Sequence, residues 1–252
     1  MLLAIDVGNS NIVFALMKGE DIVHSWRTET HAEINATTFS LGFENAGLNP
    51  DVLIGGVLGS VVPNVNEKLE TVFKALTGKD LLVVKGDGTD TGLVLDLDTP
   101  VSIGADRVLN IIAGKHYYGS PLVIIDFGTA TTYDVVDENG AFIGGAIGAG
   151  IGISLKALHS ETAQLPLIEF GEPPSVIGKN AKDALQSAAF FGALGALEGM
   201  VERIRAGLGE KATTLATGGF SGHFKGKTKA IDHFVPNLTL QGLRIVFERK
   251  NS

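Results

Sequence analysis

The sequence predicts an α/β fold, and two observations support that prediction. Segments with the apolar spacing of strands alternate with segments that have the spacing of helices, as is typical of α/β domains. A strand–turn–strand pattern near the N-terminus also occurs again in the middle of the chain. Asp6-Val7-Gly8-Asn9-Ser10 and Asp126-Phe127-Gly128-Thr129-Ala130 each follow one apolar run and precede another. We therefore expect two similar hairpins.

The first half of the chain contains most of the predicted strands. We expect strands at 2–5, 12–16, 21–27, 52–62 and 81–84, and helices at 37–46, 64–76 and 105–115. The segment 87–100 is rich in Gly, Asp and Thr, which predicts a loop at the edge of a cleft. The helix at 105–115 then leads into the second half.

The second half begins with the repeated hairpin. A glycine-rich run follows at 141–153, then a helix at 154–165 that Pro166 ends. A long helix is expected at 181–208, with Asn180 as its N-cap. Its broad stripe of small apolar residues suits close packing within a subunit or across a dimer interface. A further strand, Leu215-Ala216-Thr217, ends in the glycine turn Gly218-Gly219.

The composition excludes several classes of protein. The chain has 252 residues, 44% hydrophobic and 19% charged, which is enough for one large or two small globular domains. Its net charge of −8 argues against binding to nucleic acid. The absence of cysteine excludes disulfides, thiolate catalysis and cysteine-bound zinc.

The sequence also bears on where the protein is located. The N-terminus has no basic segment and reaches an acid at Asp6, so we expect no signal peptide. The longest uncharged run, 141–155, falls short of the roughly 20 apolar residues of a membrane helix. We expect a cytoplasmic protein without a membrane segment.

The repeated Asp motif has two interpretations. Each Asp can simply cap its own turn. Alternatively, two hairpins facing each other place two carboxylates around one cleft, where Gly8 and Gly128 let phosphate oxygens reach backbone N–H groups. Hydroxyl and amide side chains add further donors: Asn9, Ser10, Thr129, Thr131 and Thr132. Because hard cations prefer such oxygen ligands, the repeat favours a site for a metal–nucleotide phosphate chain.

Gly104-Ala105-Asp106-Arg107 is the second candidate. Asp106 can be an ordinary acid in the first turn of a helix, with Arg107 on the surface. It can also be a general base, beside an Arg107 that clamps a carboxylate or phosphate. A base next to an alcohol and a γ-phosphate is what a kinase needs.

Two glycine clusters have similar alternatives. Gly218-Gly219 can be a simple turn, or a turn that lets an adenine or ribose lie against the backbone. The glycines at 141–153 can serve close packing, or form an anion or substrate site before a helix N-terminus.

These segments together resemble the signature segments of type III pantothenate kinases. The resemblance covers essentially the whole chain, and Gly104-Ala105-Asp106-Arg107 with Asp126-Phe127-Gly128-Thr129-Ala130-Thr131-Thr132 is its most specific part. It implies two duplicated actin-like (ribonuclease H-like) domains with a cleft between them, at 1–115 and 116–252. It also implies a cytoplasmic homodimer with active sites at or near the interface.

The resemblance implies the first step of coenzyme A biosynthesis, the ATP-dependent phosphorylation of pantothenate to 4'-phosphopantothenate. The implied cofactors are Mg²⁺ with ATP, and K⁺ or NH₄⁺. Asp106 is the implied catalytic base, Asp126 the ligand of the monovalent cation, and Asp6 a ligand of Mg²⁺, directly or through water. The implied pantothenate-binding residues are Leu97, Gly104, Ala105, Asp106, Arg107 and Ala181. The implied ATP-binding residues are Asp6, Val7, Gly8, Asn9, Ser10, Asn11, Ile12, Val13, Thr129, Gly218 and Gly219.

Several positions depart from the family pattern: Ala149-Gly150 stands where a Pro-Gly is usual before the helix near Ser154, and Ala188 stands where a Gly is frequent. Leu97 stands where many members have a Tyr that contacts the substrate, and Ala181 stands where a Thr commonly reaches pantothenate from the partner subunit. These departures leave two alternatives open. One is a catalytically silent relative with a regulatory or ligand-binding role, and the other is a kinase for another small alcohol.

Overall fold

Two five-stranded sheets with the same topology form the framework of the protein. The computed structural model describes residues 1–31, 33–89, 91–99, 102–208 and 211–251. The strand orders are β3-β2-β1-β4-β5 and β10-β9-β6-β7-β8. In the first sheet β1 pairs antiparallel with β2 and parallel with β4. In the second sheet β6 pairs antiparallel with β7 and parallel with β9. The duplication predicted from the two Asp motifs is therefore present in the topology.

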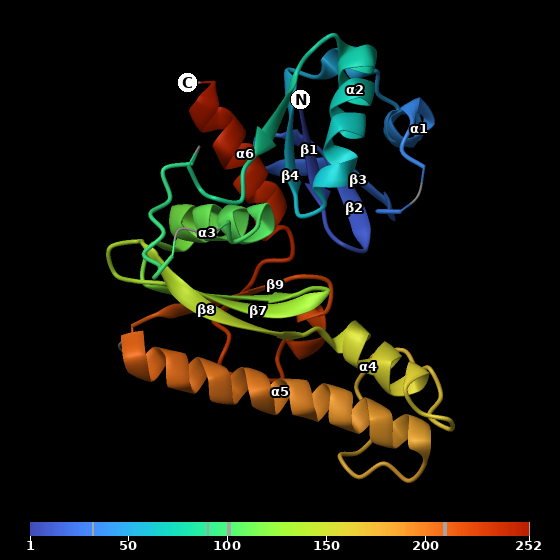
Figure 1. Ribbon diagram of the computed structural model, residues 1–252, viewed down its shortest axis with the longest axis vertical. Coiled ribbons are helices and arrows are strands. Elements are labelled where there is room, and N and C mark those ends of the chain that lie inside the picture. The colour runs from blue at the N-terminus through green and yellow to red at the C-terminus, as the bar shows by residue number, and fades with distance from the viewer. Residues whose placement is uncertain (32, 90, 100–101, 209–210, 252) are drawn as a thin grey trace. The chain divides into compact units, whose positions relative to one another are not determined.

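The elements of the first sheet come mainly from the first half of the chain. The strands are β1 (Leu2–Val7), β2 (Asn11–Lys18), β3 (Asp21–Glu29), β4 (Gly55–Ser60) and β5 (Leu81–Val84). The helices are α1 (Ala36–Ala46), α2 (Asn66–Thr77), α3 (Ala105–Tyr118) and α6 (Leu238–Lys250), with short 3₁₀ turns at Pro50–Val52 and Pro63–Val65. Helices α1 and α6 lie on opposite sides of this sheet (Figure 1).

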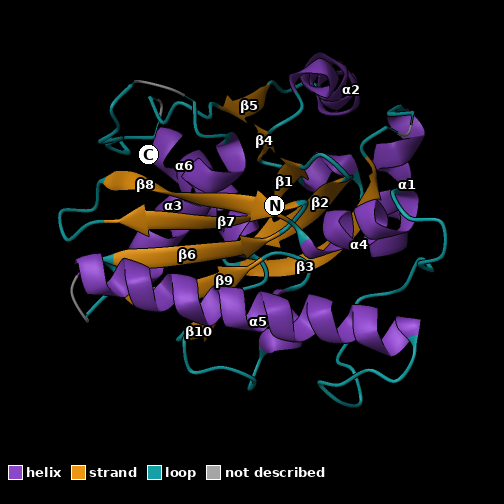
Figure 2. Ribbon diagram, turned by 60° about the horizontal axis from the view of Figure 1, so that its bottom comes forward, coloured by secondary structure: helices purple, strands orange, loops and turns teal. Residues whose placement is uncertain are grey.

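The second sheet has its own strands and helices. The strands are β6 (Leu122–Phe127), β7 (Ala130–Val136), β8 (Phe142–Ala149), β9 (Thr213–Thr217) and β10 (His233–Phe234). The helices are α4 (Ile151–Ser160) and α5 (Ala181–Leu208), with a 3₁₀ turn at Ser221–Phe224. Helix α5 runs along one face of the sheet (Figure 2). Its first turn is capped by Asn180 as expected, because the Asn180 side chain accepts the Asp183 N–H at 2.9 Å.

The chain divides into two compact units, and the C-terminal helix joins the first of them. The first unit comprises Met1–His116 and the segment from Leu238, and the second comprises Tyr117–Asn237. The sequence placed a boundary after residue 115, next to the observed one, but left the C-terminal segment in the second domain. The difference arises because α6 packs on β1 and β4, and its buried Arg244 also bonds Glu20, between β2 and β3, at 3.3 Å.

Three other expectations are corrected by the structure. The glycine-rich run at 141–153 contains a strand, β8, which pairs with β7 along its length. The helix expected at 154–165 begins at Ile151 and ends at Ser160. The strand expected at 52–62 is shorter, because a 3₁₀ turn takes up its first residue and the chain leaves the sheet after Ser60.

Glycines allow α3 to pack very closely on its neighbours in the first unit. A Cβ at Gly59 of β4 would lie 2.5 Å from Leu109, and a Cβ at Gly242 of α6 would lie 2.9 Å from the Leu109 Cα. Backbone therefore approaches backbone where α3 meets α6. The same helix carries Asp106 in its first turn, so this packing places the candidate base.

We expect Gly242→Ala to lower the free energy of unfolding by about 1–3 kcal/mol, because the added methyl group overlaps the backbone of α3. Thermal and urea unfolding measure the change. The matched control is Gly207→Ala, since Gly207 also lies in a helix but has no atom within 4 Å of an added Cβ. A control variant as unstable as Gly242→Ala would contradict the packing argument.

Candidate functional site

The candidate residues of the first unit gather where its parallel strands end. Strands β1, β4 and β5 run in the same direction, so Val7, Ser60 and Val84 lie at one edge of the sheet. The turn after β1, the residues after β5 and the start of α3 meet at this edge. In open α/β sheets the carboxyl ends of the strands are the usual place for ligands.

Asp6 faces the side of the sheet that α3 covers. It pairs in register with Gly59 on the neighbouring parallel strand, so both residues point to the same face. A Cβ at Gly59 would lie 3.9 Å from the Cβ of Ala105 in α3. These contacts bring the first Asp motif and Gly104-Ala105-Asp106-Arg107 to the same part of the first unit.

Thr30 holds the hairpin turn after Asp6. Its hydroxyl donates to the Gly8 carbonyl at 2.6 Å, and its N–H donates to the Ser10 carbonyl at 3.1 Å. The side chains of Asn9 and Asn11 are exposed on this turn. The turn is thus rigid in its backbone and open in its side chains, as a phosphate loop requires. No pattern in the sequence singles out Thr30, because its role depends on where β3 ends.

Asp106 lies half-buried in the first turn of α3. Burial raises the pKa of its carboxyl above the ordinary value of 3.8, while the Arg107 N–H and the Arg107 charge act in the lowering direction. One carboxylate oxygen, Oδ1, accepts the Arg107 N–H at 2.8 Å. A partly desolvated carboxylate with a fixed orientation suits a general base.

The structure does not bring all the expected pantothenate residues together. Leu97 is half-buried in the segment between β5 and α3, and nothing in the described residues connects it to Asp106. Ala181 lies in the second unit, as the exposed first residue of α5. Gly104, Ala105 and Arg107 are adjacent to the base. The roles of Leu97 and Ala181 therefore stay predictions.

In the second unit, Asp126 lies among the glycines of the candidate ATP site. Strands β6 and β9 are parallel and end side by side, at Phe127 and Thr217. Gly218 has a φ of 87°, and a Cβ on it would overlap Asp126 Oδ1 and lie 2.6 Å from the Phe127 nitrogen. Gly128 and Thr129 form the turn after β6, and the Thr129 carbonyl accepts the Gly150 N–H at 3.1 Å. The second hairpin and the glycine turn thus form one cluster.

The hydroxyl groups of β7 fall on two faces of the sheet. Thr132 pairs in register with Asp126 and faces the same side, whereas Thr131 pairs with Phe127 and faces α5. The Thr132 hydroxyl is buried and has no hydrogen-bond partner among the described residues. Of the two threonines, Thr132 therefore accompanies the Asp126 carboxylate, and the expectation that Thr131 joins it is corrected.

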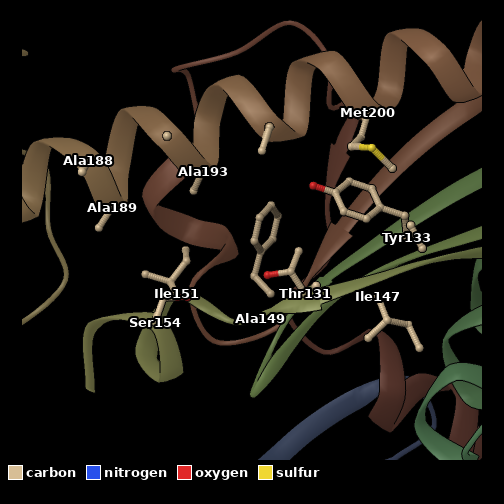
Figure 3. A pocket seen from close by; sticks show the side chains of 15 residues that line it. Thr131, Tyr133, Ile147, Ala149, Ile151, Ser154, Ala188, Ala189, Ala193 and Met200 are labelled. Atoms are coloured by element: carbon tan, nitrogen blue, oxygen red, sulfur yellow. The ribbon is translucent and has the colours of Figure 1, made fainter. Parts of the chain in front are cut away.

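A cavity of about 450 Å³ lies on the α5 face of this sheet. Its lining is mostly apolar, with Tyr133 and Met200 close together beneath the helix (Figure 3). Burial raises the pKa of the Tyr133 hydroxyl. Because Asp126 points to the opposite face, this cavity is separate from the candidate phosphate site. Phe190 and Phe224 are buried core residues of the same unit.

Helix α5 is, among the described residues, the one helix long and apolar enough by length and composition to cross a membrane. The core helix of a globular unit passes the same test. Phe190, Leu197 and Val201 of α5 belong to the buried core of the second unit. The sequence prediction overlooked this helix as a membrane candidate because it considered only the uncharged run at 141–155.

Comparisons with known proteins identify the family of the chain. The family model described as "Type III pantothenate kinase" matches residues 2–203. Type III pantothenate kinases of Brevibacillus brevis and Paramagnetospirillum magneticum are 42% and 43% identical to the chain, and the alignments cover 100% of this chain and 100% and 98% of those proteins.

Solved structures support the fold alone. A Campylobacter jejuni protein assigned to the Baf family of transcriptional activators has a TM-score of 0.62 at 15% identity, covering 99% of this chain and 98% of that one. A Sinorhizobium meliloti protein named as a 2-dehydro-3-deoxygalactonokinase has a TM-score of 0.62 at 10% identity, covering 99% and 96%. These neighbours confirm the actin-like fold. The family model and the full-length relatives show that the chain belongs to the type III pantothenate kinase family.

Proposed function

We propose that the protein transfers the γ-phosphoryl group of Mg²⁺–ATP to the primary hydroxyl of pantothenate, and that Asp106 accepts the proton of that hydroxyl. The half-buried carboxylate at the start of α3, whose pKa burial raises, is the observation that supports this role for Asp106. Gly104, Ala105 and Arg107 hold pantothenate around it. Phosphoryl transfer depends mainly on alignment and charge stabilisation, so a positioned base and a positioned phosphate chain meet its main needs.

We assign phosphate-binding groups to the hairpin turn of each unit. In the first unit, the turn after Asp6 offers exposed amides above a backbone held by Thr30. In the second, Thr129, Gly218 and Gly219 lie around the end of β6. We assign Asp6 to the Mg²⁺ that accompanies ATP. Mg²⁺ usually keeps several waters and is bound through one or two carboxylates and the substrate phosphates, so a single carboxylate suffices for this role.

The test of this function is a substrate panel. Purified protein with Mg²⁺–ATP and K⁺ should convert pantothenate to 4'-phosphopantothenate, followed by mass spectrometry and ADP release. Other small primary alcohols at equal concentration should react far more slowly. Binding of ATP or pantothenate without turnover would instead support a silent relative, and a faster reaction with another alcohol would support a different kinase.

Asp126 and Thr132 fit a monovalent cation such as K⁺ or NH₄⁺. Both side chains supply oxygen, they face the same side of the sheet, and the Thr132 hydroxyl is buried without a partner in the described residues. Hard cations prefer such ligands. When bound, the cation would add positive charge near the phosphate site.

We expect wild-type activity to rise with K⁺ or NH₄⁺ relative to tetramethylammonium, and Asp126→Asn to lose that dependence because the ligand charge is gone. Initial rates across a cation titration, at constant ionic strength, measure it. The matched control is Asp137→Asn, on an exposed turn of the same unit, where the carboxylate accepts the Ala141 N–H at 2.7 Å. Equal stimulation of Asp126→Asn and wild type would remove Asp126 as the ligand.

The protein is also proposed to form a homodimer through α5. Only four of the 28 residues of α5 are buried: Ser187, Phe190, Leu197 and Val201. A stripe of small residues on the helix is exposed, namely Ala184, Ala188, Gly192, Gly195 and Ala196. A second copy packed on this stripe would bring the partner's α5 close to this one.

Ala188→Glu is expected to shift the protein from dimer to monomer, because a carboxylate would be buried without a partner in the interface. Size-exclusion chromatography with light scattering measures the mass. Ala36→Glu is the matched control, since Ala36 is exposed at the start of α1, where an acid is tolerated. A wild-type protein that is monomeric at micromolar concentration would contradict the proposal.

A further inference from the structure

Gly86 lies two positions after the short strand β5. It packs directly against the segment that leads to Asp106. We propose that Gly86 is a positioning residue, which sets the place of the Asp106 carboxylate through the backbone of Gly104. This inference rests on the proposed role of Asp106 as the base. Gly86 itself touches no reacting group in this scheme.

The contact between Gly86 and Gly104 is one of backbone against backbone. A Cβ at Gly86 would lie 2.9 Å from both the Cα and the carbonyl carbon of Gly104, and 2.5 Å from the hydroxyl oxygen of Ser102. The Gly86 carbonyl also accepts the Ile103 N–H at 2.8 Å. The two segments are thus joined by a hydrogen bond and separated by a distance that only glycine permits.

Gly104 transmits this contact to the base. A Cβ at Gly104 would lie 2.7 Å from Asp106 Oδ1, so the carboxylate rests against the Gly104 backbone. The Gly104 carbonyl accepts the Val108 N–H at 3.2 Å, which makes it part of the first turn of α3. A displacement of Gly104 therefore moves both the carboxylate and the turn that carries it.

The main effect of an alanine at position 86 would come from its contact with the backbone of Gly104. The φ of Gly86 lies outside the left-handed region, so alanine has no conformational penalty there. Ser102 can turn its hydroxyl away, but the backbone of Gly104 has to shift. A misplacement of about 1 Å can cost about 10²-fold in rate. We expect a fall in kcat of about 10- to 100-fold, with the KM for ATP unchanged.

The deciding experiment is a double-mutant cycle with Gly86→Ala and Asp106→Asn, using pantothenate and Mg²⁺–ATP. If Gly86 acts through Asp106, Gly86→Ala lowers kcat in the wild-type background but changes the residual rate of Asp106→Asn by less than about twofold. An equal loss in both backgrounds would overturn the inference. Full turnover by Asp106→Asn would instead remove Asp106 as the base, a separate failure of the proposed function that also ends this inference.

Two further variants separate the contact with Gly104 from other effects. Ser102→Ala in the Gly86→Ala background removes the hydroxyl contact but keeps the backbone overlap, so it should not restore kcat; restoration would overturn the inference. Gly56→Ala is the matched control for overpacking, because its Cβ would lie 2.6 Å from Phe73 and Leu81 side chains near the start of β4. It should lower the melting temperature while leaving kcat within about twofold of wild type.

If Gly86→Ala fails to fold, Val61→Ala is added to it as a second substitution. Val61 contacts Gly104, with its Cγ1 3.7 Å from the position of a Cβ there. Removing that side chain gives Gly104 room to move, so the double variant should fold while Asp106 stays displaced. Its kcat should remain about 10-fold or more below that of Val61→Ala alone. Equal rates for these two variants would overturn the inference.

Discussion

Asp106→Asn is expected to lower kcat by about 10²- to 10⁴-fold, which is the usual contribution of a general base. The amide has nearly the shape of the carboxylate but cannot accept the hydroxyl proton. Steady-state rates with pantothenate and Mg²⁺–ATP measure the loss. The matched control is Asp80→Asn, whose exposed carboxylate bonds Lys74 at 2.6 Å and should leave kcat unchanged.

The same variant tests whether burial of the Asp106 carboxylate raises its pKa and so affects stability. Burial raises the pKa of Asp106, so the folded protein holds the proton more tightly than the unfolded chain. The ionised Asp106 carboxylate therefore lowers the free energy of unfolding at neutral pH. This loss disappears as the pH falls through the raised pKa and the carboxylate becomes protonated. Asp106→Asn should melt at the same or a higher temperature than wild type at pH 7. A clearly lower melting temperature of Asp106→Asn would contradict a raised pKa of Asp106.

The raised pKa also predicts the pH dependence of the wild-type enzyme. Because the base must be ionised to accept a proton, kcat/KM for pantothenate, which reports the free enzyme, should fall as the pH decreases through the pKa of Asp106. That acid limb should lie above the ordinary carboxyl value of 3.8. Rates measured between acid and neutral pH, with separate checks that the protein stays folded, locate it.

Gly218→Ala is the second change with a large expected effect. Its Cβ would overlap Asp126 Oδ1 and lie 2.6 Å from the Phe127 nitrogen, and its φ of 87° costs an L-residue about 1–2 kcal/mol. Asp126 and the end of β6 must then move. We expect kcat/KM for Mg²⁺–ATP to fall by about 100-fold, as for other misplaced sites, together with a lower melting temperature.

Gly222→Ala is the matched control for this change. Gly222 lies four residues further along the same segment, has no left-handed φ, and has no atom within 4 Å of an added Cβ. Its kcat/KM for ATP should stay close to that of wild type. If Gly218→Ala destabilised the protein but left the kcat/KM for ATP intact, the glycine would serve folding and not nucleotide binding.

Much of the fold could be predicted because its signals are local. Alternating and helical apolar spacings mark β1, β2, α2 and α5 in the sequence, and the repeated Asp motif predicts the shared topology of the two sheets. The candidate base, Asp106, was found in the same way, since the residues that identify it are neighbours in the chain. Motifs of this kind need no knowledge of what packs on them.

The features that were missed depend on partners far away in the sequence. The run at 141–153 has too many glycines for a strand by propensity, yet Phe142–Ala149 forms one because the edge of β7 is available for pairing. The C-terminal segment belongs to the first unit because α6 packs on β1 and β4. Thr30 holds the turn after Asp6 only because β3 ends beside it.

The sequence by itself therefore determined the α/β class, the duplication, and the residues that carry charge at the site. Only the tertiary structure decided how those residues are held. It showed that Thr132, and not Thr131, accompanies Asp126, because the pleat puts neighbouring side chains on opposite faces. It also showed that Gly86 and Gly104 approach backbone to backbone beside Asp106, because close packing is a property of segments that meet in space and leaves no periodic pattern in the chain.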